Sequence, residues 1–465
     1  MPLRTATLGK FQTAVAPKVP AVPAFSANPL PSVRAVRKEI CLATHRRAMP
    51  VRSQSVAPAV GTSPRTFLTS SQLTNTLAQR VYDDWHATYV KDAGGSGAPA
   101  GSKYVRMDIR SVAEWQSQPP GGHYPRNVTT SEAIGYGMLV SVLMGKEDDF
   151  KAFLSFYEHF RNSPNSRDLM SFQQAEDSDY GFMRSVGYNA SSATDGDLDA
   201  AYALFLACEQ NWTGAGYKGK GQKICAALKA FCIDSGTLMP KLGDWTSDRS
   251  TKQETGTGIN QKCNFITRTS DWMLGHFRKF SQWDDSSRTS FWTQVHDKVR
   301  DAYVNHYHDF RGAKGLVADF HVFDSSIGKF RPVRGKILEK DPEDGHFGYN
   351  ACRVPWRLAA YLKDVGQMRA TAEGIFEVME AQKEFFESQL TNGNHIIAGY
   401  KLDLTPSTPN NIYQLNNWSG PALALLKVMN SGSVQQLETD VTQLYNNNKG
   451  YYQDTVLLLS LLQSM

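Results

Sequence analysis

Residues 66–465 carry apolar side chains at the spacing of amphipathic helices. Phe153, Phe156 and Phe160 follow one another at intervals of three and four residues. Because such intervals bring side chains to one face of a helix, whereas a strand needs intervals of two, the pattern predicts a mostly helical domain. Short strands are expected in the loops at 316–323 and 394–402. Twelve helices are predicted, near residues 71–88, 130–145, 148–162, 197–210, 216–231, 271–281, 287–303, 355–363, 366–388, 419–430, 434–446 and 451–463.

The first 65 residues differ in composition from the rest of the chain. Within the first sixty, nine side chains are basic and only Glu39 is acidic, a charge of +8 that leaves −3 of the overall +5 to the remainder. The basic balance belongs to this tail, so we expect no nucleic-acid partner. A segment rich in Ala, Pro, Ser and Arg and nearly free of acid is typical of an organellar transit peptide. We therefore expect a disordered transit peptide or linker over 1–65, directed to a plastid ahead of a mitochondrion, with secretion as the alternative and a plain disordered tail as the simpler interpretation.

Residues 66–465 are numerous enough to bury one large core. The six cysteines of the chain form no C-x-x-C pair and no metal-ligand spacing with histidine, so neither a metal nor another cofactor is expected. The apolar run Val456 to Leu462 is too short to cross a bilayer. These features predict a monomeric domain without a membrane partner.

Three carboxylates crowd the start of the apolar run Ala200 to Leu206. Asp195, Asp197 and Asp199 follow Thr194 in alternate positions. One acid suffices to cap a helix or to complement the positive end of its dipole. Since the three side chains cannot all face one way, the surplus predicts a helix end that lines a polar cleft.

A single carboxylate, Glu132, stands at the head of a second apolar helix. Small residues at 133, 135 and 137 would let another backbone or a ligand approach this helix closely, and Tyr136 offers a ring on which a ligand could stack. Judged by spacing alone, the plainer interpretation of Glu132 is a first-turn dipole partner, and a catalytic acid is the alternative.

Five ordered motifs together resemble glycoside hydrolase family 8, over roughly residues 66–465. They are S-E-A-I-G-Y-G-M at 131–138, A-T-D-G-D at 193–197, T-R-T-S-D-W-M at 267–273, N-A-C-R-V-P-W-R at 350–357 and Y-Y-Q-D at 451–454. The resemblance implies an all-α fold, an (α/α)6 barrel or six-hairpin toroid, whose long loops form an open groove for a polysaccharide or oligosaccharide substrate. It also implies that residues 66–465 are the catalytic domain of a glycoside hydrolase.

The resemblance identifies the first catalytic carboxyl group by its position and the second only through a subgroup of the family. Hydrolysis of a glycosidic bond needs a protonated acid at the leaving oxygen and a second carboxylate. Glu132 matches the family's general acid by position, but Asn350 stands where many members have an aspartate base, and an amide cannot accept a proton. A subgroup that includes chitosanases shows the same asparagine together with a glutamate from the preceding loop, which implies Glu339 as the base.

The loop that supplies this base leaves alternatives open. Asp344 is the second candidate, and Asp341 and Glu343 are expected to be solvated. The plainer interpretation is that the whole charged run over 336–347 is simply an exposed loop.

The remaining roles also rest on the resemblance. Asp195 is expected to bind the sugar at the cleavage point, and Asp197 to cap its helix. Arg353 would orient the water or the base together with Asn350, with a structural ion pair as its alternative. Asp271, Trp272 and Tyr136 are expected to bind substrate. Four tryptophans beside polar motifs could stack on sugar rings, namely Trp245, Trp272, Trp356 and Trp418.

The function expected from these residues is an inverting endo-hydrolase of a β-1,4-linked polysaccharide. Chitosan is preferred to cellulose or mixed-linkage glucan because Asn350 matches the chitosanase subgroup and because several acids could complement amino sugars. The alternative is a catalytically inactive glycan-binding protein that keeps the same cleft, for which the missing aspartate is the main argument.

Overall fold

The computed structural model describes residues 76–93, 97–107, 128–176, 183–185, 190–212, 216–246, 266–335, 338, 344–408 and 413–465. All of them belong to one compact unit, Ser63–Met465. The tail over 1–65 lies outside the described residues. Among the residues described, no helix has the length and apolar character that crossing a membrane requires.

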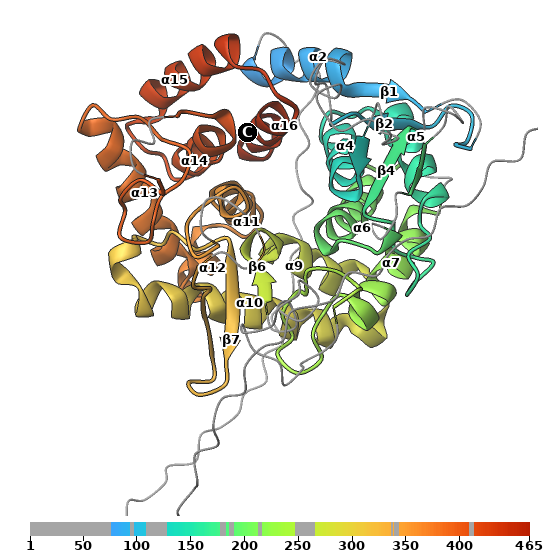
Figure 1. Ribbon diagram of the computed structural model, residues 1–465, viewed down its shortest axis with the longest axis horizontal. Coiled ribbons are helices and arrows are strands. Elements are labelled where there is room, and N and C mark those ends of the chain that lie inside the picture. The colour runs from blue at the N-terminus through green and yellow to red at the C-terminus, as the bar shows by residue number, and fades with distance from the viewer. Residues whose placement is uncertain are drawn as a thin grey trace, which may run out of the picture. The chain divides into compact units, whose positions relative to one another are not determined.

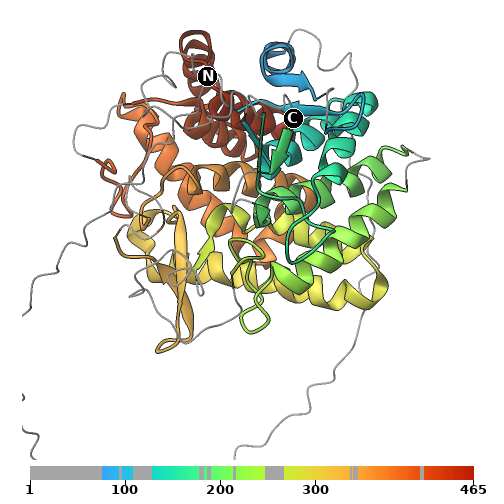
Figure 2. The same cartoon turned by 45° about the vertical axis from the view of Figure 1, so that its right-hand side comes forward.

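Six inner helices form a closed ring in which each packs against the next and the last returns to the first (Figure 1). In Figure 2 the closure is visible where the red C-terminal helices lie beside the teal helix α4. The inner helices are α4 (Ser131–Leu143), α6 (Thr194–Glu209), α9 (Leu274–Trp283), α11 (Val354–Val365), α14 (Asn416–Val428) and α16 (Tyr451–Ser464).

The outer helices alternate with the inner ones along the chain, and each packs against an inner neighbour. They are α2 (Leu77–Tyr89), α5 (Glu147–His159), α7 (Tyr217–Phe231), α10 (Thr289–Asp309), α12 (Gln367–Ala372) with α13 (Ile375–Thr391), and α15 (Val434–Asn447). This alternation of inner and outer helices is the predicted (α/α)6 barrel, and the twelve predicted helices are confirmed, one of them in two pieces. The break between α12 and α13 falls at Gly374, whose φ of 75° lies in the left-handed region that favours glycine.

The side chains explain which helices are inside. Along α4 every residue except Glu132 is buried, so this helix can only sit between other elements. By contrast α15 buries just Leu437, Val441 and Tyr445, a single stripe at intervals of four residues. A helix with one apolar stripe covers a core, whereas a helix that is apolar all round must be enclosed.

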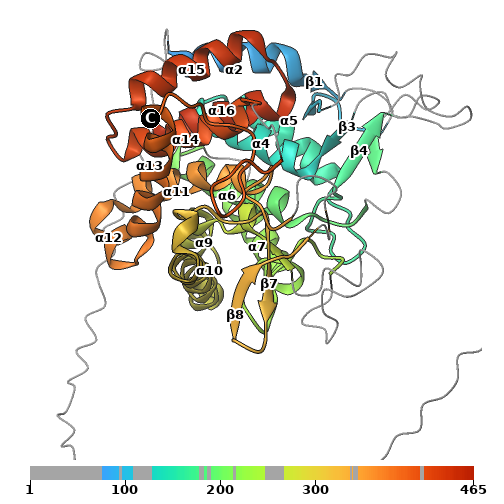
Figure 3. The ribbon, with the colours of Figure 1, turned by 60° about the vertical axis from the view of Figure 1, so that its left-hand side comes forward.

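Short antiparallel strands decorate the loops. The pairs are β1 (Val90–Asp92) with β2 (Lys103–Val105), β3 (Val128–Thr130) with β4 (Gln173–Glu176) and then β5 (Met183–Ser185), and β6 (Ile266–Arg268) with β7 (Phe320–Asp324) and then β8 (Lys329–Pro332). In the last sheet Thr267 pairs with His321, and Val322 with Arg331. Figure 3 shows the β7–β8 hairpin beside α10. Four 3₁₀ turns complete the described elements: η2 (Thr269–Asp271), η3 (Ser286–Arg288), η4 (Arg311–Ala313) and η5 (Ala351–Arg353).

One of the two predicted strands is wrong. The segment predicted at 316–323 becomes β7 from Phe320 onward. Over 394–402, which the structure describes in full, no strand forms, and Tyr400 makes only isolated bridges to Phe347 and Pro406. The apolar residues of this segment pack against the barrel core as an irregular loop instead.

An ion cluster ties three inner helices together inside the barrel. Both carboxylate oxygens of Asp199 on α6 accept hydrogen bonds from Arg357 on α11, at 2.8 and 2.7 Å. His276 on α9 lies 2.8 Å from the same carboxylate through Nε2. Burial opposes the charge, but Arg357 and the hydrogen bond with His276 outweigh it and lower the pKa of Asp199 to about 2. The buried acid therefore stays ionised and depends on its partners.

Removing Arg357 should destabilise the barrel strongly. The Arg357→Met variant keeps the side-chain volume but leaves the Asp199 charge buried without its main partner, so we expect a loss of about 3–5 kcal/mol in the free energy of unfolding. Urea unfolding followed by tryptophan fluorescence would measure it. The double variant Asp199→Leu/Arg357→Met should recover part of the loss, because no buried charge then remains. Lys314→Ala, which breaks the exposed ion pair with Glu384, is the control and should change the midpoint little. An Arg357→Met midpoint equal to this control would contradict the account.

Candidate active site

Two glycines let the N-terminal ends of α4 and α6 touch. A Cβ atom on Gly196 would lie 2.4 Å from the backbone carbon of Ser131, and one on Gly135 would lie 2.8 Å from the carbonyl oxygen of Gly196. Any side chain at either position would push the helices apart. This close approach brings Glu132, at the start of α4, beside Asp195, at the start of α6.

Glu132 is the one incompletely buried residue of α4, with 16% of its side chain exposed. Burial raises its pKa to about 7, an effect that Arg353 opposes and that the negative charge of Asp195 and a hydrogen bond to Asp195 reinforce. Thr130 caps the helix by accepting a hydrogen bond from the Ala133 N–H at 3.2 Å, so Glu132 is not needed as the cap. A carboxyl group with such a pKa is still partly protonated near neutral pH and can donate its proton.

Asp195 has the opposite electrostatic balance, with only 2% of its side chain exposed. Burial favours its neutral form, but Arg268, Arg353 and the hydrogen bond from Glu132 outweigh burial and leave its pKa below the ordinary value. Arg268 donates to Asp195 Oδ2 at 2.7 Å. The neighbouring carboxyls therefore differ in charge: Glu132 holds the proton and Asp195 is ionised.

Arg353 is the common partner of these groups. Its Nη1 donates to Glu132 Oε2 at 2.6 Å and to the Tyr136 hydroxyl at 3.0 Å. Its Nη2 donates to Ser270 Oγ at 2.8 Å and to Asn350 Oδ1 at 3.1 Å. Since the fork of a guanidinium is planar and rigid, these bonds fix the relative positions of α4, η2 and η5.

The Asn350 side chain accepts one of these bonds. The turn that contains Asn350 is itself held by hydrogen bonds to Asp319. Asp319 Oδ1 accepts hydrogen bonds from the backbone N–H groups of Gly348, Asn350 and Ala351, at 3.1, 3.0 and 2.6 Å. Burial raises the pKa of Asp319 to about 7 against these hydrogen bonds. The sequence does not predict a role for Asp319, whose only signal is its position as an acid between the apolar Ala318 and Phe320.

Asp271 belongs to the same polar cluster but is fully enclosed. Its Oδ1 accepts from Ser270 Oγ at 3.1 Å, while its Oδ2 has no hydrogen-bond partner in the described part of the chain. Burial raises its pKa to about 7, opposed by Arg268. The structure thus brings Glu132, Asp195, Asp271, Asn350 and Arg353 together, as the motifs predict. It adds Arg268 and Ser270, which lie in the motif at 267–273 but for which the sequence predicts no role.

The aromatic residues differ from expectation. Tyr136 has no exposed surface, and its ring packs against Trp356, so it offers no stacking face here and serves as a partner of Arg353. Trp272 is buried as well and donates to Thr267 Oγ1 at 3.0 Å. Trp356 and Trp418 are also core residues. Of the four candidate tryptophans only Trp245 is exposed, at 36%, and Tyr349, which was not predicted to stack on a sugar, is exposed at 46%.

The three acids at the start of α6 point to three different neighbours. Asp195 faces the cluster, and Asp199 joins Arg357. Asp197 does not cap its helix as expected: it accepts hydrogen bonds from the Tyr157 and Ser192 hydroxyls and from the Met170 N–H. The residue at the cap position is Ala193, which makes no capping bond.

Of the two candidate bases, Glu339 and Asp344, the structure describes only Asp344. Glu339 lies outside the described residues, as do Asp341 and Glu343. Asp344 is buried, and its Oδ2 accepts from the Leu338 N–H at 2.5 Å, so its carboxylate closes the base of the loop. This position suits a structural role for Asp344 better than a catalytic one.

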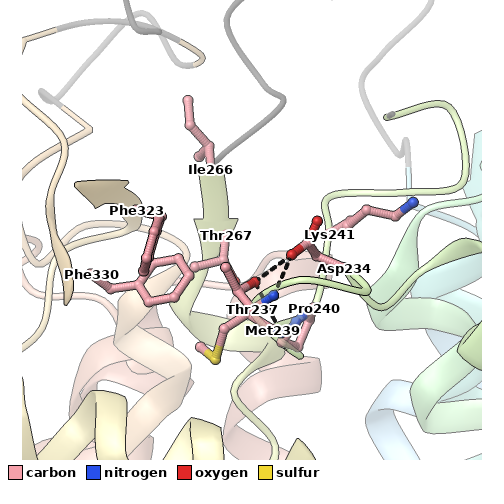
Figure 4. Close-up of a pocket in the computed structure, with 9 residues that line it drawn as sticks. All are labelled: Asp234, Thr237, Met239, Pro240, Lys241, Ile266, Thr267, Phe323 and Phe330. Atoms are coloured by element: carbon pink, nitrogen blue, oxygen red, sulfur yellow. Dashed lines mark hydrogen bonds between the residues drawn. The ribbon is translucent and has the colours of Figure 1, made fainter. Parts of the chain in front are cut away.

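A hollow lies beside β6 and is lined in part by Ile266 and Thr267. Figure 4 shows Phe323 and Phe330 of the β7–β8 hairpin facing the turn that Asp234 holds through Thr237. None of its lining residues belongs to the Arg353 cluster. In the part of the chain that the structure describes, no group of histidine, cysteine or acidic side chains is arranged to hold a metal ion.

Comparison with known proteins gives consistent results. The profile of "Glycosyl hydrolases family 8" matches residues 124–384, more than half of the chain. A β-glucanase of Niallia circulans is 28% identical over 389 residues, which cover 82% of each protein. An endoglucanase of Bacillus sp. strain KSM-330 is 29% identical over 406 residues, covering 84% of this chain and 76% of that enzyme.

Solved structures agree. The apo β-1,3-1,4-glucanase of Paenibacillus sp. X4 superposes with a TM-score of 0.65 at 26% identity, over 87% of this chain and 95% of that one. A cold-adapted family 8 xylanase superposes with a TM-score of 0.62 over 86% and 94% of the two chains, and at 15% identity this likeness concerns the fold alone. With the helical ring, the acid cluster and the profile match in agreement, this chain belongs to glycosyl hydrolase family 8.

Proposed function

We propose that this glycoside hydrolase is an inverting endo-enzyme acting on a β-1,4-linked polysaccharide, with Glu132 as the general acid. The observation that carries the proposal is the contact of two buried carboxyls with unequal partners: Arg268 donates to Asp195 at 2.7 Å and favours its ionised form, whereas burial raises the pKa of Glu132 to about 7. An acid for the leaving group and an anion beside the sugar are what an oxocarbenium-like transition state requires. The endo-glucanases and β-glucanases among its relatives support an endo-acting enzyme on β-glycans.

The base in this proposal is Glu339. Asp195 is hydrogen-bonded to Glu132, which leaves no room for the water that an inverting enzyme holds between its two carboxyls. Asn350 cannot accept a proton, and Asp344 is engaged by the backbone of Leu338. The resemblance to the subgroup with Asn350 implies a glutamate from the preceding loop, and Glu339 should then place its carboxyl about 6.5–9.5 Å from that of Glu132.

Loss of either carboxyl should nearly abolish hydrolysis. We expect Glu132→Gln and Glu339→Gln to lower kcat by about 10²–10⁴-fold, because each removes a proton-transfer group, while Glu384→Gln on the surface leaves it unchanged. Polarimetry or NMR of the first products should show inverted, α-configured ends. Glu339→Ala supplied with azide should regain turnover and release an α-glycosyl azide, since a small nucleophile replaces the activated water. Products of β configuration would contradict the inverting mechanism, and an active Glu339→Gln would move the base elsewhere.

Substrate preference is the second part of the proposal. Asn350 matches the chitosanase subgroup, and the acids of the preceding loop, Glu339, Asp341 and Glu343, could complement a cationic polymer. The names of the relatives favour glucans instead, so β-glucan is the second candidate.

A panel of polymers should separate the two candidates. We expect chitosan to be cleaved fastest, ahead of carboxymethyl cellulose, barley glucan and xylan, with a rapid fall in polymer length that marks endo attack. Reducing ends and viscosity, measured together, give both quantities. Faster cleavage of barley glucan would replace chitosan by mixed-linkage glucan. Binding of the polymers without any cleavage would favour the inactive glycan-binding alternative.

We also propose that residues 1–65 target the enzyme to a plastid, on the basis of their composition alone. A fusion of this segment to a fluorescent protein, expressed in plant cells, should accumulate in plastids, and the chain lacking it should keep its hydrolytic activity. A fusion that stays in the cytosol or enters the secretory pathway would contradict the targeting. Loss of activity on deletion would contradict the separate catalytic domain over 66–465.

A further inference from the structure

Asp319 connects three segments next to the polar cluster of Arg353. Its backbone carbonyl accepts from the Thr269 N–H at 3.0 Å, which joins it to η2, and its own N–H donates to the His346 carbonyl at 2.8 Å. Its side chain then holds the turn that follows. Asp319 therefore links the strand β7 that it precedes to both η2 and the segment leading into η5.

Both oxygens of the Asp319 carboxylate lie against the turn over 348–351. One oxygen accepts three backbone N–H groups, from Gly348, Asn350 and Ala351. The other oxygen lies so near Gly348 that a Cβ atom there would come within 2.4 Å of it. The three N–H donors favour the ionised form of this carboxyl group, whereas its burial disfavours that form.

The turn held in this way leads into η5, which carries the group that contacts the general acid. Arg353 in η5 follows Asn350 by three residues and donates to both the carbonyl and the side-chain oxygen of Asn350. The same guanidinium donates to Glu132 at 2.6 Å. No hydrogen bond joins Asp319 to Glu132 among the described residues, so the hydrogen-bonded route from Asp319 to the acid runs through this turn and Arg353.

We propose that Asp319 is a positioning residue for catalysis, which fixes the 348–351 turn so that Arg353 is held against Glu132. The proposal rests on the role of Glu132 as general acid. It distinguishes Asp319 from an ordinary buried anchor, because the position of Arg353 sets how strongly Glu132 holds its proton. Loosening the turn should therefore change the chemistry of the acid as well as the stability of the fold.

The direction of that change follows from the charges around Glu132. The groups that face it are Asp195 from α6, Arg268 from β6, Arg353 from η5, Tyr136 from its own helix, and Tyr451 and Tyr452 from α16. Arg353 is the strongest influence that favours the ionised form of Glu132. If Arg353 moves away, the pKa of Glu132 rises, and the acid stays protonated to higher pH.

The test is the pH dependence of hydrolysis in two variants that loosen the turn independently. Asp319→Asn keeps the size and one acceptor oxygen but removes the charge, and Gly348→Ala forces the carboxylate away from the backbone. In both we expect kcat to fall about 10–100-fold, with KM within about twofold, because the acid is misplaced while the sugar sites remain. The alkaline limb of the kcat profile should move up by roughly 0.5–1 pH unit, a fraction of the effect of a close opposite charge.

A matched control is Asp234→Asn. Asp234 also anchors a turn from a nearly buried position, accepting from the N–H groups of Gly236 and Thr237 and from the Thr237 hydroxyl. The Asp234→Asn variant should lower the midpoint of unfolding without moving the alkaline limb of the kcat profile. Arg353→Lys should shift the limb in the same direction as Asp319→Asn.

Other outcomes would overturn the proposal in distinct ways. An alkaline limb that stays in place in Gly348→Ala and in any folded Asp319→Asn would reduce Asp319 to a structural anchor. Azide rescue of Asp319→Ala with release of an α-glycosyl azide would make it the base. Full activity in Glu132→Gln would instead remove the proposed general acid, and the failure would then lie with the proposed function.

Discussion

The site depends on one buried guanidinium. Arg353 enters from η5 and bonds to groups on α4, η2 and its own turn, so three parts of the barrel that are far apart in sequence share one rigid planar group. A charge so deeply placed is tolerated only if acids surround it, and Glu132 and Asp195 are the nearest. The acids of the active site are therefore structural partners of Arg353 as well as candidates for chemistry.

That arrangement explains how two carboxyls in contact can take different roles. Burial acts on both Glu132 and Asp195 and favours the neutral form of each. Arg268 bonds directly to Asp195, and with this added charge Asp195 ionises first. Its negative charge then works against ionisation of Glu132, which keeps the proton. Asp195 is bonded to Arg268 and Glu132 is not, and this difference makes Asp195 the anion and Glu132 the acid at this site.

The acids at the start of α6 are likewise divided among different partners. The acids at 195, 197 and 199 lie within one and a half turns of α6, yet they serve the active site, a loop anchor and the core ion cluster. An inner helix has neighbours on every side, so each direction around it meets a different element. This is why a motif that looks like a surplus of caps contains no cap in the structure.

Local sequence patterns predicted the helical content and the order of the helices, and they singled out Glu132, Asp195, Asp271, Asn350 and Arg353, which the structure places in one polar cluster. These follow from periodicities and motifs, which are local in the chain. The sequence did not determine which aromatic residues face solvent: Tyr136 and Trp272 stand in motifs beside polar residues, yet both are buried by helices distant in sequence. It also gave little indication of Asp319, whose three partners lie about thirty residues away and are backbone groups that every residue type but proline offers. Burial, and with it the pKa values that divide the carboxyls, arises only when the ring closes, because desolvation depends on all neighbours at once.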